Sequence, residues 1–238
     1  VRGFAALWLG LACGSVLAEA GDWPRHGRDN GEQRFSPLTG INRDNVGQVG
    51  LAWQTLLDST RGLEATPIVV DGVMYVTSTW SRVFALDART GAVRWTYDPE
   101  VPKVWARKGC CDVVNRGVAV ADGRVFLGTF DGRLVALKAS DGSVLWDVNT
   151  IDRSKPYTIT GAPRVAGDKV VIGNGGADFG ARGYFSAYDV ATGKMKWRFY
   201  TVPASATGPF EHPELEMAAS TWSRDSRWEM GGGGTVWD

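Results

Sequence analysis

The sequence predicts an all-β protein built from repeated four-stranded sheets, and its composition and one internal repeat support this prediction. Glycine is abundant, with 31 residues among 238, and tryptophan is unusually frequent, with 11. Many glycines together with β-branched and aromatic residues are typical of short strands joined by tight turns. The 26 basic and 26 acidic residues cancel, so no net charge attracts the chain to nucleic acid or to an anionic membrane.

The first twenty residues have the pattern of a secretory signal peptide. Arg2 precedes the apolar run FAALWLGLACGSVL, and Ala18-Glu19-Ala20 supplies a small-residue cleavage pattern. The run is too short for a comfortable membrane span. We therefore expect residues 1–20 to be removed, which leaves Cys110 and Cys111 as the cysteines of a mature chain in an oxidising compartment.

A three-point pattern recurs along the chain and sets the expected architecture. It occurs in ALDARTGAVRW (85–95), ALKASDGSVLW (136–146) and AYDVATGKMKW (187–197), each with Ala first, Gly seventh and Trp eleventh. Successive tryptophans of the series are 51 residues apart. Self-similarity at a fixed period indicates a repeat architecture.

Each repeat contains two expected hairpins. The first turns at Asp71-Gly72, Asp122-Gly123 or Gly167-Asp168. In the second, one strand ends at a triplet such as Ala-Leu-Asp, a turn glycine takes positive φ, and the next strand ends in the tryptophan. That ring is large enough to pack between neighbouring sheets. Four antiparallel strands per repeat predict the blade of a β-propeller.

The number of repeats predicts an incomplete ring. Three full blades and parts of a fourth fit between Trp53 and Asp238, and Trp237 stands near the start of another expected strand. A closed ring needs about four to eight blades. We therefore expect residues 21–238 to be the N-terminal part, about four blades, of a longer propeller, because the open sheet edges of this part alone disfavour a soluble protein.

Several common functional motifs are excluded. The two histidines, His26 and His212, lack zinc-ligand spacing, and the glycines of GNGGADFG (173–180) lack the third glycine of a dinucleotide fingerprint. The sequence contains no phosphate-binding loop, no nucleophilic-serine motif and no CxxCH haem attachment site.

The adjacent cysteines Cys110 and Cys111 are the most unusual local feature. A disulfide between neighbours closes an eight-membered ring across Cα atoms about 3.8 Å apart, whereas ordinary disulfides prefer roughly 4.4 to 6.8 Å. The pair therefore forms either a strained, rigid bridge, whose flat sulfur face suits a planar ligand, or two free thiols packed in a strand.

The chain resembles the pyrroloquinoline quinone (PQQ)-dependent alcohol dehydrogenases in four segments: LEATPIVVDGVMYVTSTWSRVFALDARTG, GCCDVVNRG, GGADFGARGY and GGGGTVWD. The resemblance runs from Asp22 to Asp238. Members of that family are periplasmic quinoproteins built as eight-bladed propellers with tryptophan-docking repeats. The resemblance therefore implies a periplasmic protein, with about half of such a ring present in this chain.

The resemblance also implies a set of cofactor contacts. In that family a disulfide between adjacent cysteines stacks on one face of the PQQ ring and a tryptophan covers the other, which points to Cys110, Cys111 and Trp237. Arg116 of VNRG matches the arginine whose planar fork can bond the quinone oxygens. The remaining expected cofactor contacts are Glu64, Thr160, Gly175, Gly176, Ala177 and Thr235.

Most of these residues also have an ordinary structural interpretation. Glu64 would suit an exposed turn, and Arg116 a surface ion pair that stabilises little. Thr160 and Thr235 would suit strands. Trp237 would suit blade docking, although it falls outside the 51-residue series.

The expected metal site departs from the family pattern at one position. The family usually has a metal-ligating Glu after GGA, where this chain has Asp178. Asp retains the carboxylate on a side chain that is one methylene shorter than that of Glu. We therefore expect Asp178 to bind Ca²⁺ or another hard cation such as a lanthanide. The family's general base and further ligands lie on later blades, so no catalytic base is assigned within residues 1–238.

The expected function is oxidation of a primary alcohol to an aldehyde in the periplasm. The resemblance implies hydride transfer to metal-bound PQQ, with a cytochrome c or a haem domain as electron acceptor, and this chain alone is expected to be inactive. Two alternatives stay open: a non-catalytic propeller that serves as a protein-binding scaffold, and a relative acting on sugars. The cysteine pair, Glu64 and Arg116 favour the alcohol-oxidising enzyme.

Overall fold

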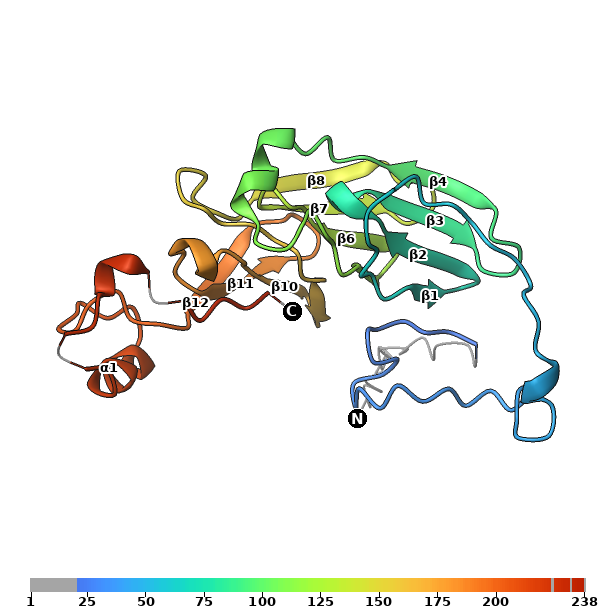
Figure 1. The fold of residues 1–238 in the computed structure, drawn as a ribbon, viewed down its shortest axis with the longest axis horizontal. Helices are drawn as coiled ribbons and strands as arrows, with labels where there is room; N and C mark the ends of the chain where they lie inside the picture. The colour runs from blue at the N-terminus through green and yellow to red at the C-terminus, as the bar shows by residue number, and fades with distance from the viewer. Residues whose placement is uncertain (1–20, 224, 232, 238) are drawn as a thin grey trace, which may run out of the picture.

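A computed structural model describes residues 21–223, 225–231 and 233–237. The expected signal peptide, residues 1–20, lies outside the described residues. Three four-stranded antiparallel sheets follow one another along the chain, and in each sheet every strand pairs with its neighbours in sequence (Figure 1). This topology confirms the prediction of an all-β protein built from four-stranded repeats.

The three sheets are called blades 1, 2 and 3 in chain order. The strands of blade 1 are β1 (Ile68–Val70), β2 (Val73–Thr77), β3 (Val83–Asp87) and β4 (Val93–Tyr97). Those of blade 2 are β5 (Val118–Ala121), β6 (Arg124–Gly128), β7 (Arg133–Lys138) and β8 (Val144–Asn149). Those of blade 3 are β9 (Arg164–Ala166), β10 (Lys169–Gly173), β11 (Tyr184–Asp189) and β12 (Met195–Tyr200).

The helical elements are short and lie before, within, between and after the blades. Their bounds are η1 (Val46–Gln48), η2 (Thr79–Ser81), η3 (Lys103–Lys108), η4 (Ala177–Phe179), α1 (Pro213–Ser220) and η5 (Trp228–Met230). No helix within the described residues is long and apolar enough to cross a membrane.

The predicted hairpin turns form where the sequence placed them. Asp71 and Gly72 have φ values of 50° and 70° between β1 and β2, as a two-residue turn with both central residues at positive φ requires. One detail of the prediction was wrong. The fourth strands do not end at the tryptophan of each repeat, since β4 continues from Trp95 to Tyr97. Trp95 pairs with Ala85 of β3, and the register of the two strands shifts next to this pair.

The repeat tryptophans dock each blade onto the next. The Trp95 Nε1 donates to Ala139 O at 2.9 Å, and the Trp146 Nε1 donates to Val190 O at 3.2 Å. The Trp95 ring lies so close to Gly142 that a Cβ there would stand 2.6 Å from it. The glycine of each repeat therefore serves both the turn, with its positive φ, and the docking of the previous tryptophan.

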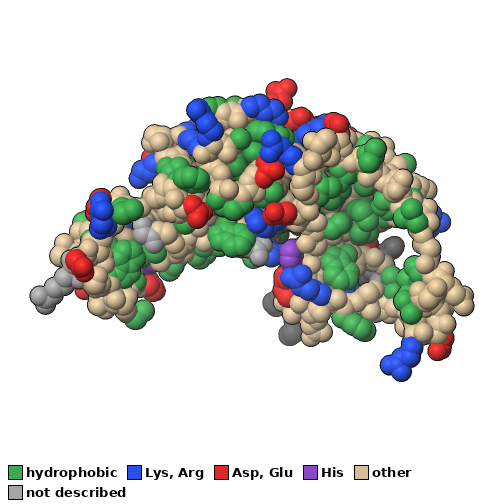
Figure 2. Space-filling view, in the orientation of Figure 1, with side chains coloured by type: hydrophobic (Ala, Val, Ile, Leu, Met, Phe, Trp, Pro, Cys, Tyr) green, Lys and Arg blue, Asp and Glu red, His purple; other side chains and the backbone are tan. Residues whose placement is uncertain are grey.

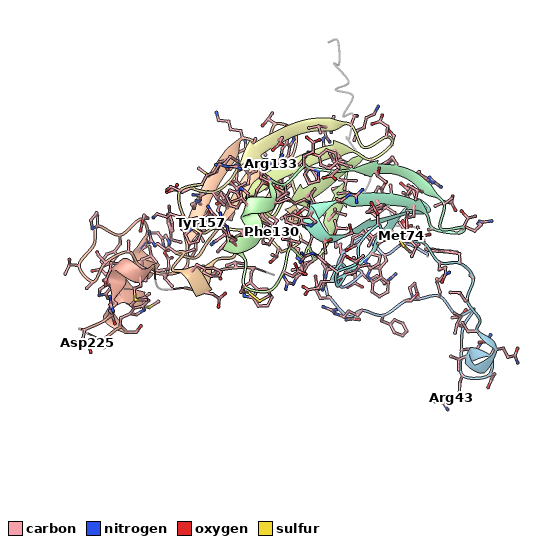
Figure 3. The ribbon with its side chains drawn as sticks, turned by 45° about the horizontal axis from the view of Figure 1, so that its top comes forward. Arg43, Met74, Phe130, Arg133, Tyr157 and Asp225 are labelled. Carbon is pink, nitrogen blue, oxygen red and sulfur yellow. A yellow bond between two sulfur atoms is a disulfide. The ribbon has the colours of Figure 1, made fainter. Side chains whose placement is uncertain are left out.

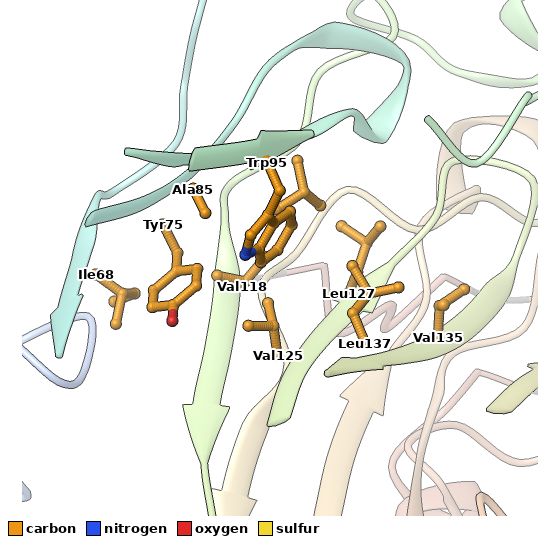
Figure 4. Close-up of a cluster of buried hydrophobic side chains, with 10 residues drawn as sticks. Ile68, Tyr75, Ala85, Trp95, Val118, Val125, Leu127, Val135 and Leu137 are labelled. Atoms are coloured by element: carbon orange, nitrogen blue, oxygen red, sulfur yellow. The ribbon is translucent and has the colours of Figure 1, made fainter. Parts of the chain in front are cut away.

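The hydrophobic core lies between the blades rather than inside any one of them. Figure 4 shows the cluster between blades 1 and 2, which consists of Ile68, Tyr75, Val83, Ala85, Trp95, Val118, Val125, Leu127, Val135 and Leu137. Each fully buried aliphatic side chain contributes roughly 1.5–3 kcal/mol. A single four-stranded blade cannot bury both of its faces, so the blades stabilise one another.

After β12 the described residues contain no further named strand, and the start of a fourth blade in this part of the chain stays a prediction. The described residues beyond Tyr200 contain α1 and η5, and Gly233 makes one isolated bridge with Arg182. Pro203, Pro209 and Pro213 interrupt this segment, and proline cannot donate to a strand ladder. Figure 2 shows the described chain as an arch, hollowed on its lower side between the segment carrying α1 and the N-terminal segment.

Candidate functional site

One cavity of about 340 Å³ collects residues from the two connections between blades, from the β6–β7 and β10–β11 connections, and from the C-terminal segment. Ten of the eleven residues singled out in the sequence line it: Cys110, Cys111, Arg116, Thr160, Gly175, Gly176, Ala177, Asp178, Thr235 and Trp237. Glu64 is absent from the lining but contacts it through Arg116. The structure therefore brings the whole predicted set together, although its members are widely separated in sequence.

The cysteine pair lies on the loop that follows η3. The two sulfur atoms are bonded, and the Cα atoms of Cys110 and Cys111 are 3.8 Å apart, as they are in any trans peptide. The bond appears in yellow in Figure 3, below the label of Phe130, which also lines the cavity. A Cβ on Gly109 would lie 2.5 Å from the Phe130 ring, so the glycine allows the loop to pack closely against Phe130.

Arg116 links three other members of the predicted set. Its Nη2 lies 3.0 Å from Glu64 Oε2, and its Nη1 donates to Thr160 Oγ1 at 2.7 Å. Its Cζ stands 4.7 Å from the centroid of the Trp237 ring, within cation–π distance. The guanidinium is thus oriented by a carboxylate and a hydroxyl while it lines the cavity.

The backbone around Arg116 is held from both neighbouring blades. Arg116 N donates to Thr160 O at 2.9 Å, and Thr66 N donates to Arg116 O at 3.2 Å. The adjacent Asn115 is 2% exposed, donates from Nδ2 to Gly128 O at 2.8 Å and accepts from Gly117 N. Sequence reasoning assigned Asn115 no role, although it lies in the GCCDVVNRG segment that carries the family resemblance.

Besides the cysteine loop and the region of Arg116, the segment between β10 and η4 forms a third wall of the cavity. Gly175 N donates to Thr158 O at 2.7 Å, and Gly176 has φ of 112° with no room for a Cβ beside Pro156 O. This close backbone packing turns η4, with Asp178, toward the cavity. Among the described residues, no side chain or backbone group bonds the exposed Asp178 carboxylate.

The fourth wall is the C-terminal segment, which lies against blade 3. Gly183 N donates to Gly233 O at 2.8 Å, and Thr201 Oγ1 donates to Gly234 O at 2.5 Å. Any side chain on Gly173 would clash with Val236 O, so glycine permits this approach. Thr235 and Trp237 reach the cavity in this way, and neither lies in a strand.

The lining suits a flat ligand that carries negative charge. A disulfide, an indole and a planar guanidinium surround one space, and Arg116 is able to bond carbonyl or carboxylate oxygens through its fork. These features fit PQQ, which has several of both groups. A hard cation needs six to eight oxygen ligands, whereas the described residues hold no group of three or more metal-ligating side chains. Asp178 is a suitable donor for such an ion but supplies only one carboxylate.

Seven further residues line the same cavity without having been predicted: Lys108, Gly109, Asp112, Val114, Phe130, Thr158 and Phe179. Lys108, Gly109, Asp112 and Val114 flank the cysteine pair in sequence, so proximity to that motif was a usable signal. Phe130 and Thr158 come from other connections and could be placed only by the fold. Phe179, next to Asp178, completes the lining.

Comparison with known proteins agrees with the architecture. Residues 23–232 match the family described as the β-propeller domain of glucose, ethanol and alcohol dehydrogenases that use PQQ. The chain is 59% identical to quinohemoprotein alcohol dehydrogenase ADH IIB of Pseudomonas putida, over 98% of this chain and 34% of that protein. It is 54% identical to the 1-butanol dehydrogenase (cytochrome c) of Thauera butanivorans, over 93% and 33%.

Solved structures show the same relationship. The structure of quinohemoprotein alcohol dehydrogenase ADHIIG from Pseudomonas putida superposes with a TM-score of 0.89 at 57% identity, over 92% of this chain and 32% of that one. A europium-containing methanol dehydrogenase superposes with a TM-score of 0.81 at 37% identity, over 92% and 40%. The chain spans about a third of the length of the curated relatives it matches. It belongs to the PQQ-dependent alcohol dehydrogenase family, and its three blades are part of that family's β-propeller.

Proposed function

We propose that the protein containing this chain oxidises a primary alcohol to an aldehyde, with PQQ bound in the cavity described above. The observation that carries the proposal is the meeting of the bonded cysteine pair, Arg116 and Trp237 around one space. Bound PQQ supplies the two-electron chemistry that accepts the hydride of the alcohol.

The residues of this chain bind and orient the cofactor. Cys110 and Cys111 cover one face of the ring and Trp237 covers the other. Arg116 donates to the quinone oxygens, with Glu64 and Thr160 fixing its guanidinium. Close backbone contact and polar donors at the edges of the cofactor come from Gly175, Gly176, Ala177 and Thr235. None of these residues is assigned the role of general base.

Asp178 is the proposed metal ligand from this part of the protein. Its carboxylate lines the cavity and is suited to Ca²⁺ or a lanthanide. The europium-containing methanol dehydrogenase supports a lanthanide as a candidate. The names of the quinohemoprotein and cytochrome c-coupled relatives support a haem domain or a cytochrome c as the electron acceptor.

We also propose that residues 1–20 direct export to the periplasm and are removed, and that residues 21–238 form the N-terminal part of the propeller. The A-x-A pattern at residues 18–20 supports cleavage after Ala20. Mass measurement of the N-terminus of the exported protein tests this assignment.

The function is tested on the complete gene product, purified without cofactor and then supplied with PQQ and either Ca²⁺ or a lanthanide. Oxidation of short primary alcohols, followed with an artificial electron acceptor, is expected only when PQQ and a cation are both present. A protein that takes up no PQQ would favour the scaffold alternative. A protein that takes up PQQ but oxidises only sugars would instead favour the sugar-dehydrogenase alternative.

A further inference from the structure

The loop that carries the cysteine pair has few attachments of its own. Within the described residues, no backbone hydrogen bond joins residues 109–111 to the rest of the chain. Cys110 and Cys111 are both exposed at the cavity. The position of the disulfide relative to the other cavity walls is therefore set by the residues at the two ends of this loop.

The C-terminal end of the loop is held by Asp112 and Val113. The Asp112 carboxylate accepts from Val113 N at 2.7 Å and pairs with Arg61. Val113 O accepts from Trp80 N at 3.0 Å, and Val113 is fully buried. This end is thus attached to blade 1 through several independent contacts.

At the N-terminal end of the loop, Trp105 of η3 belongs to the same buried cluster as Ile151 and Tyr157 of the connection between β8 and β9, and a polar tether to that connection comes from Lys108. Its Nζ donates to Arg153 O at 2.9 Å and to Lys155 O at 3.0 Å. The same ammonium stands 4.1 Å from the centroid of the Trp105 ring, and Trp105 is buried. Two of the three ammonium donors are therefore used on backbone carbonyls, and the charge lies on an aromatic face.

The two carbonyls belong to the connection between β8 and β9, which forms another wall of the cavity. The connection continues to Thr158 and Thr160, and its Pro156 O packs against Gly176. Lys108 therefore joins the wall that carries the disulfide to the wall that contacts Arg116 and the glycine segment. Charge-assisted bonds of this kind are about twice as strong as bonds between neutral groups.

Lys103 offers a matched comparison on the same helix. It also places its ammonium on an indole, 3.7 Å from the centroid of Trp80, but it makes no hydrogen bond to the β8–β9 connection within the described residues. The tether to that connection is thus specific to Lys108 and is not a general property of the basic residues of η3.

We propose that Lys108 is a positioning residue that fixes the distance between the Cys110–Cys111 disulfide and the opposite side of the cofactor cavity. The proposal deepens the function given above, because it concerns how that site is preorganised for PQQ. Holding a binding group in place before the ligand arrives lowers the ordering cost of binding. Truncating Lys108 therefore weakens cofactor binding by releasing the loop that carries the disulfide, and the reduction equilibrium without PQQ reports that release separately.

The test uses the complete gene product with Lys108→Met, Lys108→Arg and Lys103→Met, and it makes two measurements on each. The first is the equilibrium for reduction of the cysteine pair by dithiothreitol, without PQQ. The second is the dissociation constant for PQQ, followed by quenching of tryptophan fluorescence. Thermal unfolding of each variant checks that the fold is kept, and Lys108→Gln replaces Lys108→Met if that variant does not fold.

The proposal predicts that Lys108→Met raises the PQQ dissociation constant about tenfold and makes the pair easier to reduce, because a released loop gains more freedom as a dithiol. Lys108→Arg, which keeps the charge and the donors, is expected to restore most of both values, and Lys103→Met to change neither. If Lys108→Met matches Lys103→Met in either measurement, the positioning role is wrong. If the unaltered protein binds no PQQ, the proposed function fails, and the reduction equilibrium alone then decides whether Lys108 holds the loop.

Discussion

Arg116 shows how one side chain organises this site. Its guanidinium has five donors, and contacts with Glu64 and Thr160 orient it while the rest of the fork stays available to the cavity. The ion pair is partly open to water, with side-chain exposures of 22% and 41%, so it contributes little to stability. The structure thus places Glu64 against the Arg116 guanidinium and outside the cavity lining.

Replacing Arg116 with Ala is expected to raise the PQQ dissociation constant by about tenfold or more, because a charge-assisted bond to a buried oxygen is worth about 1.5–3 kcal/mol. Thermal stability should change little. Arg124→Ala is the matched control, since among the described residues the Arg124 side chain donates only to Asp122 O, at an exposed turn. Equal PQQ affinities of Arg116→Ala and Arg124→Ala, measured by equilibrium dialysis, would show that Arg116 does not contact the cofactor.

At the scale of the element, each blade depends on a glycine in the following blade. Gly142 has φ of 75° and packs directly against the Trp95 ring, whereas Gly72 has φ of 70° at a turn with open space around it. The two glycines share a backbone conformation but differ in what a methyl group would meet. Comparing an alanine substitution at each glycine therefore separates the free-energy cost of a strained turn from the cost of disturbing tryptophan docking.

Gly142→Ala is expected to lower the free energy of unfolding by about 2–4 kcal/mol, since it adds overpacking against Trp95 to the strain of a left-handed backbone. Gly72→Ala should lose only the backbone part, about 1 kcal/mol. Urea unfolding of both variants measures the difference. Similar losses for the two would mean that the tryptophan does not dock on Gly142.

A second feature of the blades makes their stability depend on pH. Asp87 in blade 1 and Asp189 in blade 3 end the third strand of their sheets. The basic side chains of Arg94 and Lys196, followed by the hydroxyls of Thr90 and Thr192, hold the pKa of both carboxyls at about 2, below the ordinary 3.8. Because the pKa is lowered in the folded state, these contacts stabilise the blades above about pH 4, and the stability is lost as the pH falls toward about 2.

The double variant Asp87→Asn and Asp189→Asn should therefore lose stability less steeply than the unaltered protein between about pH 4 and pH 2. Urea unfolding at several pH values in this window gives the slope of the unfolding free energy for each protein. Parallel slopes would show that these two carboxyls are not held in their ionised form by the fold.

At the scale of the whole molecule, the blades were predictable from the repeat itself, whereas the site residues were predictable only through the family resemblance. Turns such as Asp71-Gly72 and the docking tryptophans act over a few residues or at a fixed period, so a single sequence displays them. The bond from Arg116 to Thr160 spans 44 residues, and those from Lys108 span 45 and 47. Such contacts arise from the stacking of blades, so the cavity could be assembled only through a family resemblance or the fold itself.

Helix α1 also escaped prediction, for a physical reason. It has eight residues, starts at Pro213 and carries Glu214 and Glu216 in its first turn, which favours a helix start. A helix this short has little intrinsic stability and depends on tertiary contacts, such as the burial of Leu215. Its sequence signal is correspondingly weak beside the strong β repeat.

The account as a whole depends on a planar cofactor lying between the cysteine pair and Trp237. A crystal structure of the complete gene product with added PQQ tests this most directly. The account predicts flat density in the cavity, stacked between the Cys110–Cys111 sulfur atoms and the Trp237 indole, with Arg116 in hydrogen-bond contact with its edge. Density bound elsewhere, or a cavity with separate thiols and no ring between them and Trp237, would contradict it.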